Sequence, residues 1–281
     1  MPGKCIVLGG NGFIGSHLIK ALVNEGHSVT NVDIDSVSVN DAHNYLSVNS
    51  TPISIFEREI SHSDWIFHLA GVSDITAAEE MGADVLSANL APTASVIKSI
   101  AKRRTKRVIF ASSMYAAGPQ LSYYALSKNF CEQALIYGCK KAGVSHSICR
   151  IGSVYGRGAP ENNRIALMLA NVSSKQKLTI NGPHTQRGYV YIDDVVDALI
   201  SQMAQSENKY LNIRNPNEVT DSQLVDLLRE IMGAPAVDVS ISRMLPENRF
   251  AKTPYRVDQI RFEDIAVKTS LDQGLFDTLN L

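Results

Sequence analysis

A glycine-rich turn near the start of the chain stands between a short apolar run and an amphipathic stretch. The apolar run is Cys5–Leu8, and the turn that follows reads Gly-Gly-Asn-Gly-Phe-Ile-Gly over residues 9–15. Apolar residues then recur at three- and four-residue spacing as far as Gly26, which predicts a helix that begins near Phe13. A strand, a glycine turn and a helix in this order are typical of the first unit of a parallel α/β sheet.

The spacing of the glycines predicts that this turn binds a dinucleotide. Gly9 permits the tight turn, Gly12 allows the backbone to approach a pyrophosphate, and Gly15 allows the helix to pack closely on the strand. The first helical residues, Phe13 and Ile14, would present the helix N-terminus to the anion.

Further apolar runs, each bounded by Gly, Asp or Ser, predict more strands. They are 28–32, 65–69, 108–111 and 147–151. Short runs of this kind are typical of strands that are buried on both faces and joined by helical crossovers. A chain of 281 residues with 44% hydrophobic residues can bury a large core. We therefore expect an α/β fold with a doubly wound parallel sheet, built as one broad unit or as two closely joined lobes.

Asp33 closes the second expected strand, eighteen residues after Gly15. A carboxylate there would accept hydrogen bonds from both adenosine ribose hydroxyls and would repel a 2′-phosphate. No arginine follows it directly, so we expect NAD rather than NADP as the cofactor. The alternatives are that Asp33 only caps a loop, or that Asp35 takes its role.

Tyr124 and Lys128 stand four residues apart in a stretch that favours a helix, so they would share one helix face. Tyrosine has a pKa near 10 and is a poor base at neutral pH. Lowering that pKa by about three units requires about 4 kcal/mol of preference for the phenolate. One positive charge about 5 Å away contributes about 3 kcal/mol at an effective dielectric constant near 20. Lys128 and an oxidised nicotinamide ring would together be sufficient.

Ser112 and Ser113 follow the expected strand 108–111 at its C-terminal end, where open α/β sheets bind their ligands. One of these hydroxyls would orient a substrate oxygen toward Tyr124. Serine, tyrosine and lysine in this arrangement predict proton transfer at a carbinol carbon.

Composition argues against several other classes of protein. The net charge of −1 disfavours a nucleic-acid partner, and the basic cluster in residues 102–107 is too short to change that interpretation. We interpret this cluster, which includes Lys106 and Arg107, as a solvated helix end. No secretory signal and no apolar run of about 18 residues is present, which predicts a soluble, cytoplasmic protein that does not associate with membranes.

The four cysteines form no CxxC pair and have no histidine at ligand spacing. We therefore expect reduced thiols and no bound metal ion.

Beyond these motifs, the chain resembles the extended short-chain dehydrogenase/reductases, specifically the nucleotide-sugar epimerase and dehydratase family, over nearly its whole length. Residues 64–71 are similar to the D-x-x-x-H-L-A-[AG] strand that lies beside the cofactor, and Asn89 is similar to a helix asparagine of the family. Residues 111–118 resemble S-[ST]-x-x-V-Y-G, which puts the catalytic hydroxyl on Ser113. The residues that the resemblance thereby adds to the cofactor site are Leu69, Ala70, Gly71 and Asn89.

Two downstream segments extend the resemblance to the substrate. Residues 150–156 are similar to R-x-x-N-V-Y-G, with Ser153 where asparagine is usual, and residues 182–194 are similar to G-x-x-x-x-R-[DG]-[FY]-[VI]-x-V-x-D. In that family the arginine that corresponds to Arg187 contacts the diphosphate of the sugar nucleotide, and a guanidinium fork suits this contact. An ion pair of Arg187 with Asp193 or Asp194 is the alternative. Arg249 is the candidate for a second diphosphate arginine.

The resemblance also implies a division of the chain. Residues 1–160, with 189–214 returning to them, would form a Rossmann-type NAD-binding domain. Residues 161–188 and 215–281 would form a smaller C-terminal substrate-binding lobe. Helices expected at 85–101 and 124–141 resemble the pair that forms a four-helix interface in family homodimers, although their apolar positions could equally face the sheet.

Departures from the family pattern narrow the reaction. Dehydratases of the family place Asp-Glu directly after the catalytic hydroxyl, because elimination needs an added acid and base, and decarboxylating relatives carry glutamate at the second of these positions. This chain has Met114 and Tyr115 there. Tyr115 would line the sugar pocket or act as an ordinary packed aromatic residue.

We therefore expect C4 epimerisation of a nucleotide-diphosphate sugar through a transient 4-keto sugar, with Tyr124 as the base and a retained NAD. The resemblance suggests a role in surface-polysaccharide precursor synthesis. An NAD(P)H-dependent 4-ketosugar reductase, or a non-catalytic NAD-binding sensor or scaffold, are the alternatives.

Overall fold

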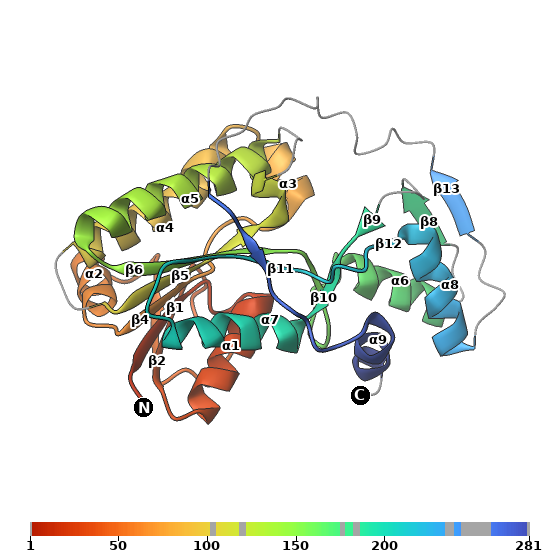
Figure 1. The fold of residues 1–281 in the computed structure, drawn as a ribbon, viewed down its shortest axis with the longest axis horizontal. Coiled ribbons are helices and arrows are strands. Elements are labelled where there is room, and N and C mark those ends of the chain that lie inside the picture. Colours follow the sequence, from red (N-terminus) through yellow and green to blue (C-terminus); the bar gives the residue numbers. More distant parts are fainter. Residues whose placement is uncertain are drawn as a thin grey trace.

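A parallel sheet of eight strands runs through the centre of the computed structural model (Figure 1), which describes residues 2–101, 105–117, 122–174, 178–181, 186–233, 239–242 and 260–279. The strand order is β14-β11-β6-β5-β4-β1-β2-β3. In chain order the strands are β1 (Lys4–Leu8), β2 (Ser28–Asp33), β3 (Asn44–Ser47), β4 (Trp65–His68), β5 (Arg107–Ser113), β6 (Ser145–Ile151), β11 (Lys209–Ile213) and β14 (Glu263–Asp264). The expected doubly wound α/β fold is confirmed.

The direction of winding reverses between β1 and β4. β1 pairs with β2 on one side and with β4 on the other, so the chain builds outward to β3 before it crosses back to β4, β5 and β6. In open α/β sheets ligands bind in the crevice beyond the carboxyl ends of the strands at such a reversal. The glycine turn at residues 9–15 and the segment 69–71 follow these two strands, so both lie at the crevice.

Helices cover both faces of the sheet, and the alternation of side chains in β1 shows why. Cys5 and Val7 belong to one apolar cluster, and Ile6 and Leu8 belong to another. The first cluster is covered by α1 (Phe13–Asn24) and α7 (Ile192–Ser201), and the second by α2 (Ile53–Ser61), α4 (Asp84–Ile100) and α5 (Tyr123–Ala142). Figure 1 shows these two layers on opposite sides of the sheet. A strand that is buried on both faces has to be apolar throughout, as the sequence of β1 is.

Local sequence signals fix the ends of the longer helices. The Ser122 side chain accepts a hydrogen bond from the Ala125 N–H at the start of α5, and Gly143 ends that helix in the left-handed conformation at φ 67°. Thr220 and Gln223 form a capping box at the start of α8 (Asp221–Met232). These signals are local, so sequence alone could place the helices.

The remaining elements gather at one end of the sheet, on the right of Figure 1. They are α6 (Arg164–Ser173), β7 (Ser153–Tyr155), β8 (Leu178–Asn181), β9 (Gln186–Arg187), β10 (Tyr189–Tyr191), β12 (Val219–Thr220), α8, β13 (Val239–Ser242) and α9 (Leu271–Leu279). Their strands form the pairs β10–β7, β12–β9 and β13–β8. The short helices α3 (Ile75–Met81), η1 (Met114–Ala117) and η2 (Gln202–Ala204) complete the described elements.

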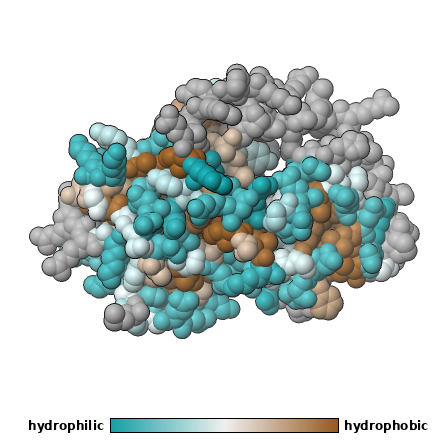
Figure 2. Space-filling model, viewed as in Figure 1, coloured by the Kyte–Doolittle hydropathy of each residue, from teal (hydrophilic) through white to brown (hydrophobic). Residues whose placement is uncertain are grey.

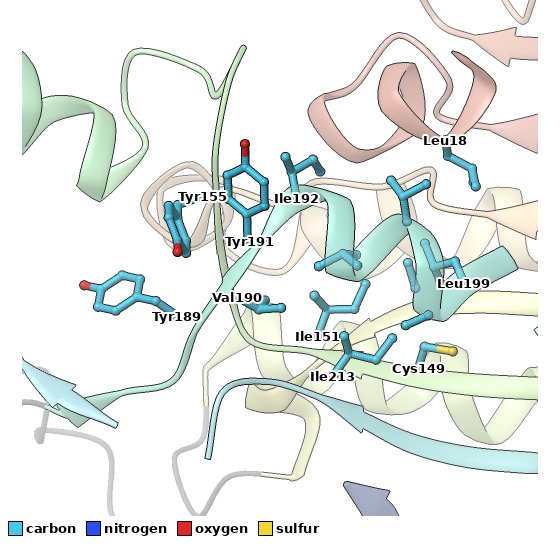
Figure 3. Close-up of a cluster of buried hydrophobic side chains, with 14 of the residues drawn as sticks. Leu18, Cys149, Ile151, Tyr155, Tyr189, Val190, Tyr191, Ile192, Leu199 and Ile213 are labelled. Atoms are coloured by element: carbon cyan, nitrogen blue, oxygen red, sulfur yellow. The ribbon is translucent and has the colours of Figure 1, made fainter. Parts of the chain in front are cut away.

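Three tyrosines pack where β7 and β10 pair (Figure 3). The ring of Tyr155 lies edge to face against Tyr191 at 5.5 Å and against Tyr189 at 6.4 Å. Val190 and Ile151 belong to the same apolar cluster as these rings. The elements at this end therefore share a core with the central sheet. The division into two lobes at residues 160 and 214 stays a prediction.

The interpretation of residues 102–107 as a solvated helix end is wrong for Arg107. This side chain is buried and begins β5. Its guanidinium donates to the main-chain oxygens of His146, Gln205 and Glu207 and to the Ser147 hydroxyl. A guanidinium has five N–H donors, so a cage of acceptors can satisfy it without solvent. Residues 102–104 lie outside the described part of the chain.

The cysteines and the surface can also be compared with what the composition predicts. Cys5, Cys131, Cys139 and Cys149 are free and buried. Figure 2 shows a face that is mostly hydrophilic, with apolar residues in separate patches. Within the described residues, no helix combines the length and the apolar character that crossing a membrane requires.

Candidate active site

The glycine turn leaves no room for side chains at its base. Gly9 has φ +82°, and its N–H donates to the Val32 carbonyl at 2.8 Å. A Cβ atom on Gly9 would lie 2.8 Å from the main-chain nitrogen of Ala70, and one on Gly15 would overlap the Gly9 carbonyl oxygen. Bare backbone is therefore held at the crevice, as close approach to a pyrophosphate requires.

The N-terminus of α1 is open toward the same place. Gly12 is the N-cap residue and offers no side-chain acceptor, and the first turn, which contains Phe13 and Ile14, has no acidic residue. The first N–H groups of an α-helix have no partner within the helix, and they attract an anion when no side chain caps them. This cradle fits the pyrophosphate of a dinucleotide cofactor.

Asp33 ends β2 beside the turn, as expected from the sequence. Its Oδ2 accepts the Asn11 N–H at 2.8 Å, and its Oδ1 accepts the Ile34 N–H at 2.7 Å. The Asn11 side chain donates to the Asp35 carboxylate at 2.9 Å. Each carboxylate oxygen has about two lone pairs, so Asp33 keeps acceptor capacity for ribose hydroxyls. Asp33 and Asp35 are two negative charges on either side of Asn11, and they make this edge unsuited to a 2′-phosphate.

The segment after β4 forms the facing wall, and Asn89 holds it in place. Asn89 Oδ1 accepts the Val72 N–H at 2.6 Å, and its Nδ2 donates to the Ser127 hydroxyl at 2.8 Å. A Cβ atom on Gly71 would lie 2.6 Å from the same Oδ1. Asn89 thus ties residues 71–72 to α5, next to the expected catalytic lysine. Leu69 and Ala70 precede this segment at the end of β4.

The structure brings Ser113, Tyr124 and Lys128 together at the carboxyl end of β5. Ser113 is the last residue of β5, and Tyr124 and Lys128 lie buried on α5. The Ser113 side chain lies close enough to the Tyr124 phenol to lower the pKa of that phenol by hydrogen bonding. Lys128 Nζ donates to the Ala111 carbonyl at 3.4 Å. The geometry that the four-residue spacing predicted is therefore present, and the catalytic roles of these residues stay a proposal.

Burial works against both charges that this site would use. It raises the pKa of Tyr124 to about 12, the hydrogen bond from Ser113 lowers that pKa, and the neighbouring Tyr115 phenol raises it. Burial also lowers the pKa of Lys128. Desolvation thus opposes the attraction between phenolate and ammonium that the spacing of Tyr124 and Lys128 predicts. Tyr124 is accordingly a neutral hydroxyl donor until further positive charge lies beside it.

Tyr115 packs directly against Tyr124 on α5. Their ring centroids lie 6.1 Å apart with the rings at 72°, and the Tyr115 N–H donates to Ser113 Oγ at 3.2 Å. Val72 and Ile75 pack in the same small apolar cluster. Tyr115, two residues after Ser113, is therefore a half-buried phenol in an apolar wall.

Arg187 pairs with a carboxylate that the sequence did not suggest. Its NH1 lies 3.1 Å from Oδ1 of Asp221, the first residue of α8. Arg164 on α6 donates hydrogen bonds to the same carboxylate from two nitrogens, Nε and NH2. Asp194, one of the two carboxylates expected as a partner, accepts the main-chain N–H groups of residues 268 and 269. Arg187 and Asp221 are 34 residues apart in the sequence, so no local pattern could predict their pairing.

Arg187 and Arg164 share the carboxylate of Asp221 in a partly buried place. The side chain of Asp221 is 1% exposed, and those of Arg187 and Arg164 are 11% and 29% exposed. Such a cluster suits an anionic ligand. Ser153, a further expected substrate residue, begins β7 and pairs with Tyr189. Arg249 lies outside the described residues.

Comparison with known proteins agrees with these features. The model of the NAD dependent epimerase/dehydratase family matches residues 5–213. The chain belongs to this family. NAD is therefore its cofactor, and the glycine cradle, the uncapped start of α1 and the carboxylate of Asp33 are the groups that would hold it. The matched range includes every expected site residue except Arg249.

Individual relatives resemble the chain over nearly its full length. A UDP-N-acetyl-alpha-D-glucosaminuronate decarboxylase of Bacillus cytotoxicus is 26% identical, over 99% of this chain and 97% of the relative. UDP-glucuronic acid decarboxylase 3 of Arabidopsis thaliana is 24% identical, over 89% of this chain and 80% of the relative. The structure of the UDP-glucose 4-epimerase of Thermotoga maritima superposes with a TM-score of 0.82 at 24% identity, over 98% of this chain and 97% of that one. This last likeness shows that the fold is shared.

Proposed function

We propose that the protein is an epimerase that inverts C4 of a nucleotide-diphosphate sugar and keeps its NAD bound between turnovers. The observation that carries the proposal is the meeting of Ser113, Tyr124 and Lys128 at the crevice that the glycine turn borders. Tyr115 beside Tyr124 favours epimerisation over the other reactions of the family.

The residues divide the proton chemistry among them. Bound NAD supplies a reversible hydride acceptor at the carbinol carbon. The Ser113 hydroxyl orients the C4 hydroxyl of the sugar, and Tyr124 takes its proton as C4 becomes a ketone. The 4-keto sugar then turns its other face to the cofactor, and Tyr124 returns the proton once C4 is reduced. Lys128 contributes the positive charge that favours the phenolate during the first half of the cycle.

Arg187 is the proposed diphosphate contact, and the two guanidinium groups that meet at Asp221 support that role, because a guanidinium fork suits a diphosphate. The diphosphate is common to all nucleotide sugars, so this contact would hold the substrate while the hexose turns. A protein of similar structure, the UDP-N-acetylglucosamine 4-epimerase from Methanobrevibacter ruminantium M1, supports a nucleotide sugar as substrate.

Decarboxylation of a nucleotide-linked uronic acid is the second candidate, because both curated relatives described above are named decarboxylases. It would begin with the same oxidation at C4. The phenol of Tyr115 counts against it, because decarboxylating members of the family carry a glutamate at this position.

The deciding experiment incubates the purified protein with UDP-glucose, UDP-N-acetylglucosamine, UDP-glucuronic acid and UDP-N-acetylglucosaminuronic acid. Products are separated and examined by mass spectrometry and NMR. Epimerisation gives an isomer of unchanged mass with inverted C4, whereas decarboxylation gives a UDP-pentose and CO₂. A lighter product from a uronic acid, without any C4 epimer from the panel, would overturn the proposal. Tyr124→Phe is the control, and it must be inactive in either case.

We also propose a homodimer that uses α4 and α5, in a cytoplasmic protein. Tyr123, Phe130 and Tyr137 are 41%, 43% and 69% exposed on α5. They recur every seven residues and therefore form one stripe along the helix. Large aromatic side chains that line up on one surface are typical of an interface.

A further inference from the structure

A buried carboxylate lies one helical turn beyond the lysine of the candidate site. Glu132 on α5 is 1% exposed, and it takes the Arg150 guanidinium through two bonds, Nε to Oε1 at 2.9 Å and NH2 to Oε2 at 2.7 Å. It also accepts the Ser112 hydroxyl at 2.5 Å. Ion pairs that are fully desolvated, bidentate and further hydrogen-bonded fix geometry strongly.

The partners of this carboxylate come from two adjacent strands at the same level. Ser112 on β5 and Arg150 on β6 are directly opposed in the parallel register, and the next opposed pair contains Ser113. Glu132 therefore fastens α5 to both strands one residue before Ser113, the hydroxyl beside Tyr124. Rotation or sliding of α5 over the sheet would break three hydrogen bonds at once.

On α5 itself, Tyr124, Lys128 and Glu132 recur every four residues, and all three are buried. Residues at this spacing lie on one helix face, so the fastening point and the two expected catalytic side chains form a single row. Glu132 fixes this row to the sheet at one end, so the positions of Tyr124 and Lys128 depend on the bonds that Glu132 makes.

We propose that Glu132, clamped by Arg150 and Ser112, is a positioning residue that holds Tyr124 and Lys128 in register with Ser113. The inference rests on the proposed chemistry at C4. It concerns the oxidation step, which epimerisation and decarboxylation would share, so it stands if the sugar reaction proves to be the other one.

Charge adds a second consequence. Burial lowers the pKa of Lys128, and the carboxylate of Glu132 opposes that effect. Among the described residues, Cys131 on α5 and His68 on β4 also interact with this lysine, Tyr124 lies one turn before it on α5, and Arg150 faces the cluster from β6. Arg150 and Glu132 cancel each other, so loss of the carboxylate alone would disfavour the protonated lysine.

The test compares Glu132→Gln with the double variant Glu132→Gln/Arg150→Gln. The single variant keeps the shape of the side chain but removes the negative charge of Glu132 from beside the buried Arg150 guanidinium, whereas the double variant removes both charges. Glu230→Gln, an exposed change on α8, is the matched control. Turnover, KM for the sugar nucleotide, retained NAD, Tm and the pH profile of kcat are measured for each.

We expect Glu132→Gln to lower kcat at least ten-fold, with KM and retained NAD changed less than two-fold, and to move the basic limb of the kcat profile to lower pH. The double variant should regain Tm and the basic limb but keep the low kcat, because its clamp is still absent. The inference is overturned if Glu132→Gln lowers only Tm and leaves kcat and its pH profile at wild-type values. It is equally overturned if the double variant regains wild-type kcat.

Discussion

The ring of Tyr115 stands edge to face on the ring of Tyr124, with 6.1 Å between their centroids. This contact places a second phenol beside the proposed proton acceptor, and that phenol raises the pKa of Tyr124. A full negative charge at the same place would raise it further, since like charges disfavour the phenolate.

Substitution of Tyr115 should therefore change the pH dependence of turnover. We expect Tyr115→Glu to move the acid limb of the kcat profile to higher pH and to lower kcat at pH 7 by at least ten-fold. Tyr115→Phe keeps the ring contact without a charge, so its acid limb should stay within about half a pH unit of wild type. The measurement is kcat from pH 5 to 10 with saturating substrate. Coincident acid limbs for the Glu variant and wild type would show that residue 115 lies too far from Tyr124 to matter.

The glycine cradle predicts a selective loss of NAD binding. Gly9→Ala puts a methyl group 2.8 Å from the Ala70 nitrogen, at a residue with φ +82°. Gly233→Ala is the matched control, because Gly233 also has positive φ, at +59°, but a Cβ atom there meets no atom within 4 Å. Both variants should lose about 1 kcal/mol of stability from backbone strain, and Gly9→Ala should lose more because its methyl group also overlaps backbone atoms of Ala70. Only Gly9→Ala should raise the Kd for NAD, by at least ten-fold in calorimetry. Equal NAD affinities would contradict the placement of the pyrophosphate.

The particular residues show what sequence could and could not reveal. The apolar runs predicted β1, β2, β4, β5 and β6, because strands buried on both faces must be apolar. β3 and β14 were not predicted, because Asn44–Ser47 and Glu263–Asp264 are short, partly polar edge strands. Spacing on one helix brought Tyr124 and Lys128 together, and the same four-residue step would have found Glu132. The Arg187–Asp221 pair and the burial of Arg107 depend on contacts between distant segments, which a local pattern does not contain.

Removal of the Arg187 guanidinium should weaken substrate binding and leave the chemical step intact. The diphosphate does not react, so a contact with it binds ground state and transition state alike. We expect Arg187→Gln to raise KM for the sugar nucleotide at least ten-fold with kcat within about three-fold. Arg229→Gln, which removes an arginine from an exposed pair with Asp226 on α8, is the control and should leave both constants unchanged. A fall in kcat with an unchanged KM would assign Arg187 to the chemistry and not to the diphosphate.

Acid should destabilise the fold through its buried histidines. Burial lowers the pKa of His68 to about 3, with the Lys128 charge as a second cause, and that of His146 to about 4. Each is neutral when folded and protonates near pH 6.5 when unfolded, so its stabilising effect is complete above pH 6.5 and is lost as the pH falls toward its folded pKa. The slope is about 1.4 kcal/mol per pH unit for each group.

Urea unfolding between pH 6 and 4.5 would measure this slope. His68→Asn should be less stable at pH 7 but should show a shallower loss on acidification, by about 1.4 kcal/mol per pH unit. His62→Asn, at an exposed position after α2, should keep the wild-type slope. Parallel curves for His68→Asn and wild type would mean that His68 is not protonated on unfolding.

The aromatic stripe on α5 predicts the oligomeric state. Phe130 stands at the middle of the stripe between Tyr123 and Tyr137 and is 43% exposed. In a dimer that packs α5 against its partner copy, Phe130→Glu would bury an unpaired charge, and the desolvation cost of several kcal/mol would exceed what an interface of this kind gains from one side chain. We expect light scattering after size-exclusion chromatography to give two chains for the wild type and one for this variant. Phe276→Glu makes the same change at a 55% exposed residue of α9, and this control variant should remain dimeric. A monomeric wild-type protein would contradict the proposed interface.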